Sequence, residues 1–122
     1  VCMLEDISII GVHYATCEML MKDWVRRAKR VNYNNILLIA TDNFLHDEEE
    51  EKRFDRIAYP KVCFTSRKDT QYDWQVYLPE FQGQSKVGDT LRYCNIFGVR
   101  IFEKHFDCVK WLNEHEGINS KS

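Results

Sequence analysis

Polar side chains that could do chemistry stand where three short apolar segments of the sequence end. They are His13, Tyr14, Thr41, Asp42 and Thr65. An imidazole can accept or donate a proton near neutral pH, so His13 is a candidate general base or hydroxyl-binding group. Asp42 is a candidate for binding a sugar hydroxyl or orienting the base, and the threonine and tyrosine hydroxyls suit a polar ligand. A structural role for His13 and a helix-capping role for the Thr41-Asp42 pair are the alternatives.

The apolar segments before these residues have the composition of buried strands. We expect strands at 6–12, 35–41, 61–65 and 74–78. Helices are expected between them. Apolar residues recur at helical spacing from Cys17, with Thr16 as the N-cap. Residues 48–58 form the second expected helix, capped by Asp47, with Glu50 completing a capping box.

A third helical period occurs near the C-terminus and is expected to pack on the sheet through apolar residues. These are Ile101, Phe102, Phe106, Val109, Trp111 and Leu112. The alternation of strands and helices predicts an α/β fold of three layers, in which helices flank a mostly parallel or mixed sheet. Ligands of such sheets bind at the carboxyl ends of the strands. The candidate residues would therefore share one edge of the sheet, if the first three strands are parallel neighbours.

The first expected helix is rich in cations, namely Lys22, Arg26, Arg27, Lys29 and Arg30. Guanidinium groups offer forked donors that match phosphate oxygens, so Arg27 and Arg30 are candidate phosphate-binding residues. The simpler interpretation is a solvated helix face, on which Asp23 pairs with Arg26 or Arg27 at helical spacing. Nucleic-acid binding is a third interpretation, but the net charge of −2 does not favour it.

The composition is that of one globular domain over residues 1–122. The longest apolar run, at 36–40, is too short to span a membrane. The five cysteines include no CxxC pair, so we expect reduced, buried cysteines in a cytoplasmic protein rather than a disulfide framework or zinc site. "TDN" at 41–43 supplies only one carboxylate, so no metal site is expected. A phosphate-binding glycine-rich loop and a nucleophile elbow are both missing from the sequence, and no cofactor is identified.

Four stretches together resemble a bacterial family designated domain of unknown function nineteen-nineteen. They are "EDISIIGVHY", "KDWVRRAKRVNYNNILLIATD", "KRFDRIAYPKVCFT" and "FGVRIFEKHFDCVKWLN". The family pattern includes Asp6, His13, Tyr14, Trp24, Arg27, Arg30, Asn32, Thr41, Asp42, the "KRFD" of 52–55 and the "WLN" of 111–113. Members are often described as exopolysaccharide or capsular polysaccharide biosynthesis proteins. The resemblance implies an α/β fold and a link to cell-surface polysaccharide assembly. Members usually carry a further N-terminal segment, so the chain resembles the C-terminal part of a larger family domain.

The leading hypothesis is a protein of surface-polysaccharide biosynthesis that binds a sugar or nucleotide-sugar ligand, and a transferase is the enzyme class considered. In this hypothesis His13 and Asp42 are the catalytic candidates, and Tyr14, Arg27, Arg30, Thr41 and Thr65 bind the ligand. The alternative is a non-catalytic binding or assembly module, whose function lies in a protein partner. The sequence leaves open whether the chain is an enzyme.

Overall fold

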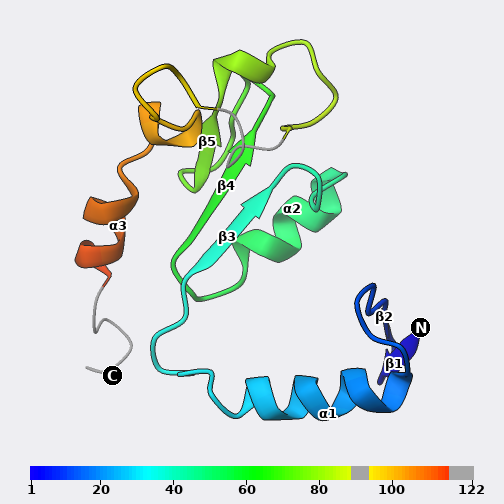
Figure 1. Ribbon diagram of the computed structural model, residues 1–122. Coiled ribbons are helices and arrows are strands. Elements are labelled where there is room, and N and C mark those ends of the chain that lie inside the picture. The colour runs from blue at the N-terminus through cyan, green and yellow to red at the C-terminus, as the bar shows by residue number, and fades with distance from the viewer. Residues whose placement is uncertain (89–93, 116–122) are drawn as a thin grey trace. The chain divides into compact units, whose positions relative to one another are not determined.

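The computed structural model describes residues 1–88 and 94–115, and the chain divides into two compact units, Val1–Tyr33 and Asn34–Ser122 (Figure 1). Each unit is described by itself below. The coarse prediction of an α/β protein is confirmed, because helices accompany a small parallel sheet of three strands. The prediction of one domain over the whole chain stays a prediction.

The N-terminal unit opens with a two-stranded antiparallel sheet. β1 (Cys2–Leu4) pairs with β2 (Ile7–Ile9), and Glu5 takes a positive φ of 55° in the turn between them. A strand was predicted at 6–12 as a covered member of a parallel sheet, and that prediction is wrong in both respects. β2 pairs with β1 instead, and the unit leaves Ile7 59% exposed, because a hairpin alone covers little of its own surface.

Helix α1 (Cys17–Ala28) begins where the sequence predicts. The hydroxyl of Thr16 accepts a hydrogen bond from the main-chain N–H of Met19 at 3.2 Å, which confirms the predicted N-cap. Leu20 is buried against the chain at Gly11, where an added Cβ would lie 2.7 Å from a methyl carbon of Leu20. A larger residue at this position would therefore require the Leu20 side chain to shift.

A disulfide joins Cys2 of β1 to Cys17, the first residue of α1. The prediction that the cysteines are reduced is therefore wrong for this pair. The sequence gives no sign of the pairing, because the two residues are 15 positions apart and belong to no recognisable cysteine motif. Cys63 is free and buried, as predicted, whereas the free cysteine Cys94 is exposed.

The C-terminal unit contains a parallel sheet in the order β3-β4-β5. Its strands are β3 (Leu38–Thr41), β4 (Lys61–Thr65) and β5 (Gln75–Tyr77). These confirm the three later strands that the sequence predicts. Helix α2 (Glu48–Asp55) lies between β3 and β4 in the chain, whereas β5 follows β4 without an intervening helix.

Both ends of α2 are held by side chains. Asp47 accepts a hydrogen bond from the N–H of Glu50 at 2.8 Å, which confirms the predicted cap. Glu50 in turn accepts one from the N–H of His46 at 2.6 Å. At the other end, the ammonium group of Lys61 donates to the main-chain carbonyls of Phe54, Asp55 and Ile57.

The core of this unit forms around β4 and the segment after β5. Its buried residues are Val62, Phe64, Leu78, Phe81 and Val87, of which Phe81 belongs to the short helix η1 (Pro79–Phe81). The C-terminal segment packs on this core through Ile101, Phe102, Phe106 and Trp111, as predicted.

The C-terminal segment is divided into η2 (Phe102–Lys104) and α3 (Cys108–Glu114), because Asp107 caps a new helix by accepting from the N–H of Lys110 at 2.9 Å. Val109 and Leu112 are also predicted to pack inward, but they are 69% and 43% exposed.

Candidate ligand site

The carboxyl ends of β3 and β4 meet at one edge of the parallel sheet. Thr41 ends β3 and pairs with Phe64, so that Asp42 and Thr65 follow side by side. The N–H of Asp42 donates to the carbonyl of Phe64 at 3.0 Å, which continues the strand pairing by one residue. The predicted convergence of Thr41, Asp42 and Thr65 at this edge is therefore observed.

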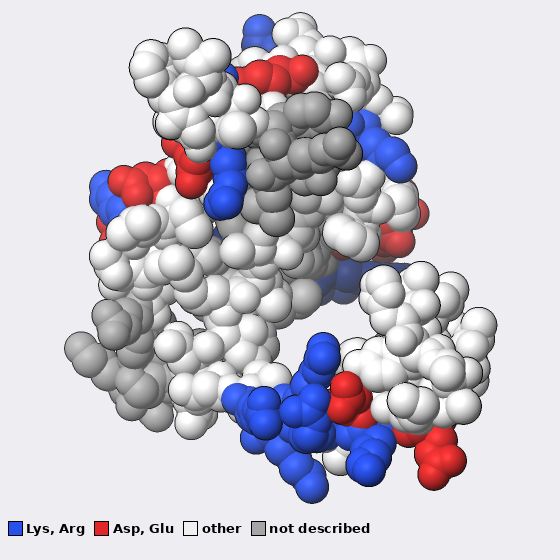
Figure 2. Space-filling model, in the orientation of Figure 1, with Lys and Arg blue, Asp and Glu red and all other residues white. Residues whose placement is uncertain are grey.

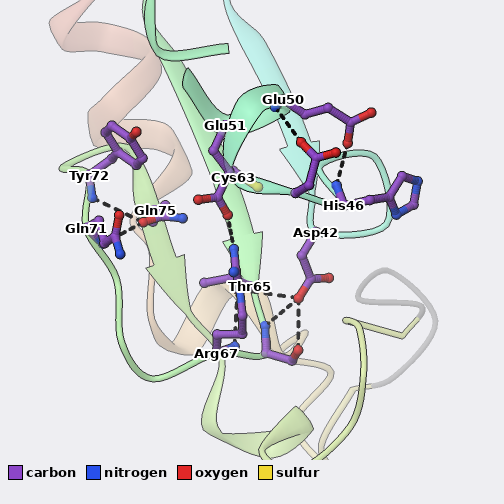
Figure 3. A network of polar contacts seen from close by, with 12 residues as sticks. Asp42, His46, Glu50, Glu51, Cys63, Thr65, Arg67, Gln71, Tyr72 and Gln75 are labelled. Atoms are coloured by element: carbon purple, nitrogen blue, oxygen red, sulfur yellow. Dashed lines mark hydrogen bonds and ion pairs between the residues drawn. The ribbon is translucent and has the colours of Figure 1, made fainter. Parts of the chain in front are cut away.

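The carboxylate of Asp42 holds two other chain segments at this edge, and Figure 3 shows its contacts at the end of β4. Its Oδ2 accepts from the N–H of Ser66 at 2.8 Å, from the Ser66 hydroxyl at 2.9 Å and from the Thr65 hydroxyl at 3.4 Å. Its Oδ1 accepts from the N–H of Val87 at 2.7 Å. A carboxylate has about four lone-pair sites, two on each oxygen, so the three donors saturate Oδ2 whereas Oδ1 keeps one site. Asp42 is also buried, which favours a positioning role over direct contact with a substrate.

The neighbouring Asn43 completes the attachment of Val87. Its amide donates to the carbonyl of Val87 at 2.8 Å and to the hydroxyl of Thr41 at 3.2 Å. Both main-chain polar groups of Val87 are thus bound by residues that follow β3, while its side chain lies in the core. This arrangement fixes the adjoining residues Ser85 and Lys86 at the edge of the sheet.

A pocket of about 320 Å³ opens at this edge. It is lined by Asp42, Leu45, His46, Arg67, Ser85 and Lys86, which come from the segments after β3, after β4 and after η1. The lining residues carry a carboxylate, an imidazole, a hydroxyl and two cationic groups. This inventory suits a polar ligand with hydroxyl or anionic groups.

Glu51 of α2 forms an ion pair with Arg67, one of the residues that line the pocket. Its side chain is only 6% exposed, and it accepts a hydrogen bond from Nη2 of Arg67, which is 55% exposed (Figure 3). A buried carboxylate is costly unless it is paired, so this contact is maintained in the folded chain. The buried Glu51 therefore fixes the direction of an exposed guanidinium beside the pocket.

The other predicted site residues, His13, Tyr14, Arg27 and Arg30, lie in the N-terminal unit. Their predicted place at the sheet edge depended on a parallel strand before His13. That premise is wrong, because β2 belongs to an antiparallel hairpin. Their roles as catalytic or ligand-binding residues stay predictions.

Two of these four residues converge on Asp23 within the N-terminal unit. The Tyr14 hydroxyl donates to Oδ2 of Asp23 at 2.8 Å, and Arg27 lies 3.8 Å from the same oxygen. Arg26 donates through Nε and Nη2 to Oδ1, at 3.1 and 2.9 Å, so the predicted pairing of Asp23 is confirmed. The hydrogen bond to Asp23 raises the pKa of Tyr14. The hydrogen bonds from Tyr14 and then Arg26 lower the pKa of Asp23.

The cationic residues of α1 and the residues after it are exposed, and Figure 2 shows basic side chains gathered over this helix. A depression of about 670 Å³ runs along α1, but one helix alone lines it and none of the predicted site residues takes part. A solvated face explains these charges as the sequence suggested, since Asp23 already compensates part of them.

Metal and membrane features are missing from the described ranges. Within residues 1–88 and 94–115, no group of three or more His, Cys, Asp or Glu side chains is arranged to hold a metal ion. In the same part of the chain no helix has the length and apolarity needed to cross a bilayer. The expectation of no metal site therefore stays a prediction, and no cofactor is identified.

Among the residues that line the pocket, only Asp42 has a site role predicted from the sequence, and the following were missed: Leu45, His46, Arg67, Ser85 and Lys86. His46 precedes a helix cap, a place where polar residues are common for local reasons. Ser85 and Lys86 stand in a polar turn segment that no local pattern connects to β3. They are linked to the site through contacts of neighbouring residues far along the chain, such as the one between Asp42 and Val87, which spans 45 positions.

Residues 1–113 match the family described as Domain of unknown function (DUF1919). The chain is also 28% identical, over 111 residues, to a protein of Haemophilus influenzae described as an uncharacterized protein. This match covers 90% of the chain and 53% of the relative, so the chain spans about half the length of that protein. No solved structure matches the chain.

Proposed function

The chain belongs to the DUF1919 family, and we propose that its sheet-edge pocket binds a sugar or activated-sugar ligand in cell-surface polysaccharide biosynthesis. The observation that carries the proposal is the convergence of Asp42, His46, Arg67, Ser85 and Lys86 on one pocket. The polysaccharide link comes from the resemblance of the sequence to proteins described by that role. The activity of the whole, longer protein is part of the proposal.

The size and chemistry of the pocket support a small polar ligand. A volume of about 320 Å³ lies at the lower end of the range of about 300–1,000 Å³ for small-molecule sites. Ser85 and His46 offer hydroxyl and imidazole groups that can exchange hydrogen bonds with sugar hydroxyls. The pocket also lies outside the carboxyl ends of parallel strands, where open α/β sheets bind ligands.

In the transferase form of the proposal, a group must accept the proton of the attacking hydroxyl. His46 supplies the imidazole that lines the pocket, so it is the candidate general base of this site. His13, which lies in the N-terminal unit, stays a separate predicted candidate for that role. Asp42 holds the segments that form the pocket and acts as a positioning residue. Thr65 is 2% exposed and supports Asp42 rather than reaching a ligand directly.

A non-catalytic binding or assembly module is the second candidate function. It is favoured by the exposed apolar side chains that the N-terminal unit does not cover by itself, such as Ile10 at 71%, Val12 at 82% and Trp24 at 44% exposure. Isolated exposed apolar residues are common, but larger contiguous groups mark interaction surfaces. In this form of the proposal the unit contributes its apolar residues to a protein partner.

The three-layer architecture and the cytoplasmic location complete the proposal. The contacts of Phe64 in β4 with Phe102 and Phe106 support one layer of C-terminal helical segments against the sheet. The cytoplasmic location was inferred in part from reduced cysteines. The Cys2–Cys17 disulfide argues against that part, because disulfides are more typical of oxidising compartments. Placement as the C-terminal part of a larger family domain rests on the resemblance.

A thermal-shift screen with glucose, glucose 1-phosphate and UDP-glucose tests the proposed function. A ligand that binds only the folded state raises the melting temperature. We expect stabilisation of the native chain and its loss in Ser85→Trp, which fills the pocket. The matched control Gln82→Trp places the same side chain at an exposed position outside the pocket and keeps the effect. Equal stabilisation of both variants would refute this site.

A further inference from the structure

Two cationic side chains line the sheet-edge pocket, and they come from different segments. Arg67 follows β4, and Lys86 lies beside Val87, whose main chain is bound by Asp42 and Asn43. Among the residues that the structure describes, Lys86 forms no ion pair. Its charge is therefore free to meet a ligand.

Arg67 is held in a fixed direction and still has donors to offer. Glu51 engages Nη2, whereas a guanidinium carries five N–H donors in a planar fork. The side chain is 55% exposed beside a partner that is 6% exposed. Fixing one end of the fork on a buried carboxylate lowers the entropy that the side chain loses when a ligand binds.

The acidic groups near the pocket are already engaged by other donors. Asp42 accepts from four donors, and Glu51 pairs with Arg67. In the first turn of α2, Glu48 and Glu49 lie 3.1 and 3.5 Å from the ammonium group of Lys52. The groups that the pocket offers to an anionic ligand are thus the ammonium of Lys86 and the free donors of Arg67, while the negative charge of Asp42 is held by neutral N–H and O–H donors.

We propose that Arg67 and Lys86 bind the phosphate group of an activated sugar and that Glu51 positions Arg67 for this contact. The arginine fork matches two phosphate oxygens, and the lysine ammonium adds a compact charge on a flexible stem. This inference rests on the proposed function and narrows the ligand of the same pocket from sugars in general to phosphorylated sugars.

Calorimetric titration of the full chain with glucose and glucose 1-phosphate tests the inference. We expect the native chain to bind glucose 1-phosphate at least about tenfold more tightly than glucose, the value of one charge-assisted hydrogen bond. Lys86→Ala and Arg67→Lys should each reduce this preference about fivefold or more. Arg67→Lys keeps the charge opposite Glu51, so the fold is preserved. Lys68→Ala, an exposed cation outside the pocket, should retain the full preference.

The outcomes separate this inference from the function on which it rests. Equal affinity for glucose and glucose 1-phosphate, or an undiminished preference in Lys86→Ala and Arg67→Lys, would overturn the phosphate assignment and leave sugar binding intact. No binding of glucose, glucose 1-phosphate or UDP-glucose would overturn both.

Glu51→Gln tests the positioning role of the buried carboxylate. This variant keeps the size of the side chain and removes the charge that orients Arg67. We expect the preference for glucose 1-phosphate to fall about threefold or more, while the affinity for glucose stays unchanged, a split that follows from losing part of an oriented charge-assisted contact. A variant that is only less stable, with an unchanged preference, would show that Glu51 has a structural role alone.

Discussion

Asp42 accepts a hydrogen bond from the main-chain N–H of Val87 at 2.7 Å, across 45 positions of the sequence. This contact brings Ser85 and Lys86 to the end of β3, where Arg67 already lies after β4. The pocket exists because one buried carboxylate holds these segments together. Asp42 is therefore assigned the role of a positioning residue rather than that of a reactive group.

Asp42→Ala should lower the free energy of unfolding by about 2–6 kcal/mol, because buried main-chain donors of Ser66 and Val87 lose their acceptor at about 1–3 kcal/mol each. Urea denaturation of the two proteins measures the difference. Asp69→Ala, at an exposed position, is the control and should change the midpoint little. Similar midpoints for the two variants would contradict the role of Asp42.

Cys63 should resist alkylation in the native chain. Burial, and then the charge of Asp42, raise the pKa of its thiol to about 12, so little thiolate is present at neutral pH. The exposed Cys94 serves as the internal control and should react readily with iodoacetamide. Mass spectrometry of the peptides reports both sites, and equal labelling of Cys63 and Cys94 would contradict the burial.

The hydrogen bond between Tyr14 and Asp23 should make the stability of the N-terminal unit depend on pH at both extremes. The pKa of Tyr14 is raised, so its contribution is complete below the ordinary tyrosine pKa of about 10 and is lost as the pH rises through the higher folded value. The pKa of Asp23 is lowered, so its contribution is complete above the ordinary value and disappears as the pH falls through the lower one.

Titration of the Tyr14 ring by NMR checks this sign. Asp23→Asn should lower the pKa of Tyr14, whereas Glu18→Gln, on the same helix and outside this contact, should leave it raised. An identical titration curve in native chain and Asp23→Asn would exclude the contact.

The Cys2–Cys17 disulfide should stabilise the N-terminal unit by about 3 kcal/mol, the value expected for closing a loop of about 15 residues. Dithiothreitol should therefore lower the unfolding midpoint of this unit. The Cys2→Ser/Cys17→Ser double variant should start at the lower midpoint and be insensitive to the reductant. A reductant effect of the same size in both proteins would contradict the assignment.

Local patterns predicted the parts of the fold that depend on neighbouring residues. Thr16 and Asp47 cap helices through bonds to N–H groups three positions away, and the β4 segment is apolar enough to be identified on its own. The pairing of β2 with β1 was missed because a short apolar segment does not specify its partner. The pairing of Cys2 with Cys17 has no local signal either.

The candidate site was predicted in part for the same reason. Asp42 and Thr65 follow strands that the sequence shows clearly, so their convergence could be predicted. The place of Lys86 in the site could not be predicted, because it depends on the contact between Asp42 and Val87. Arg27 was assigned to phosphate from its chemistry alone, and the structure instead places it 3.8 Å from Asp23.

Amide NMR during titration with UDP-glucose tests the central claim most directly, because it reports where on the chain a ligand binds. If the ligand binds at the sheet-edge pocket, we expect saturable shifts of the amide resonances of His46, Arg67, Ser85 and Lys86. The amide resonances of His13, Arg27 and Arg30 should stay unchanged. Shifts confined to the second group, or none at the sheet-edge pocket, would contradict it.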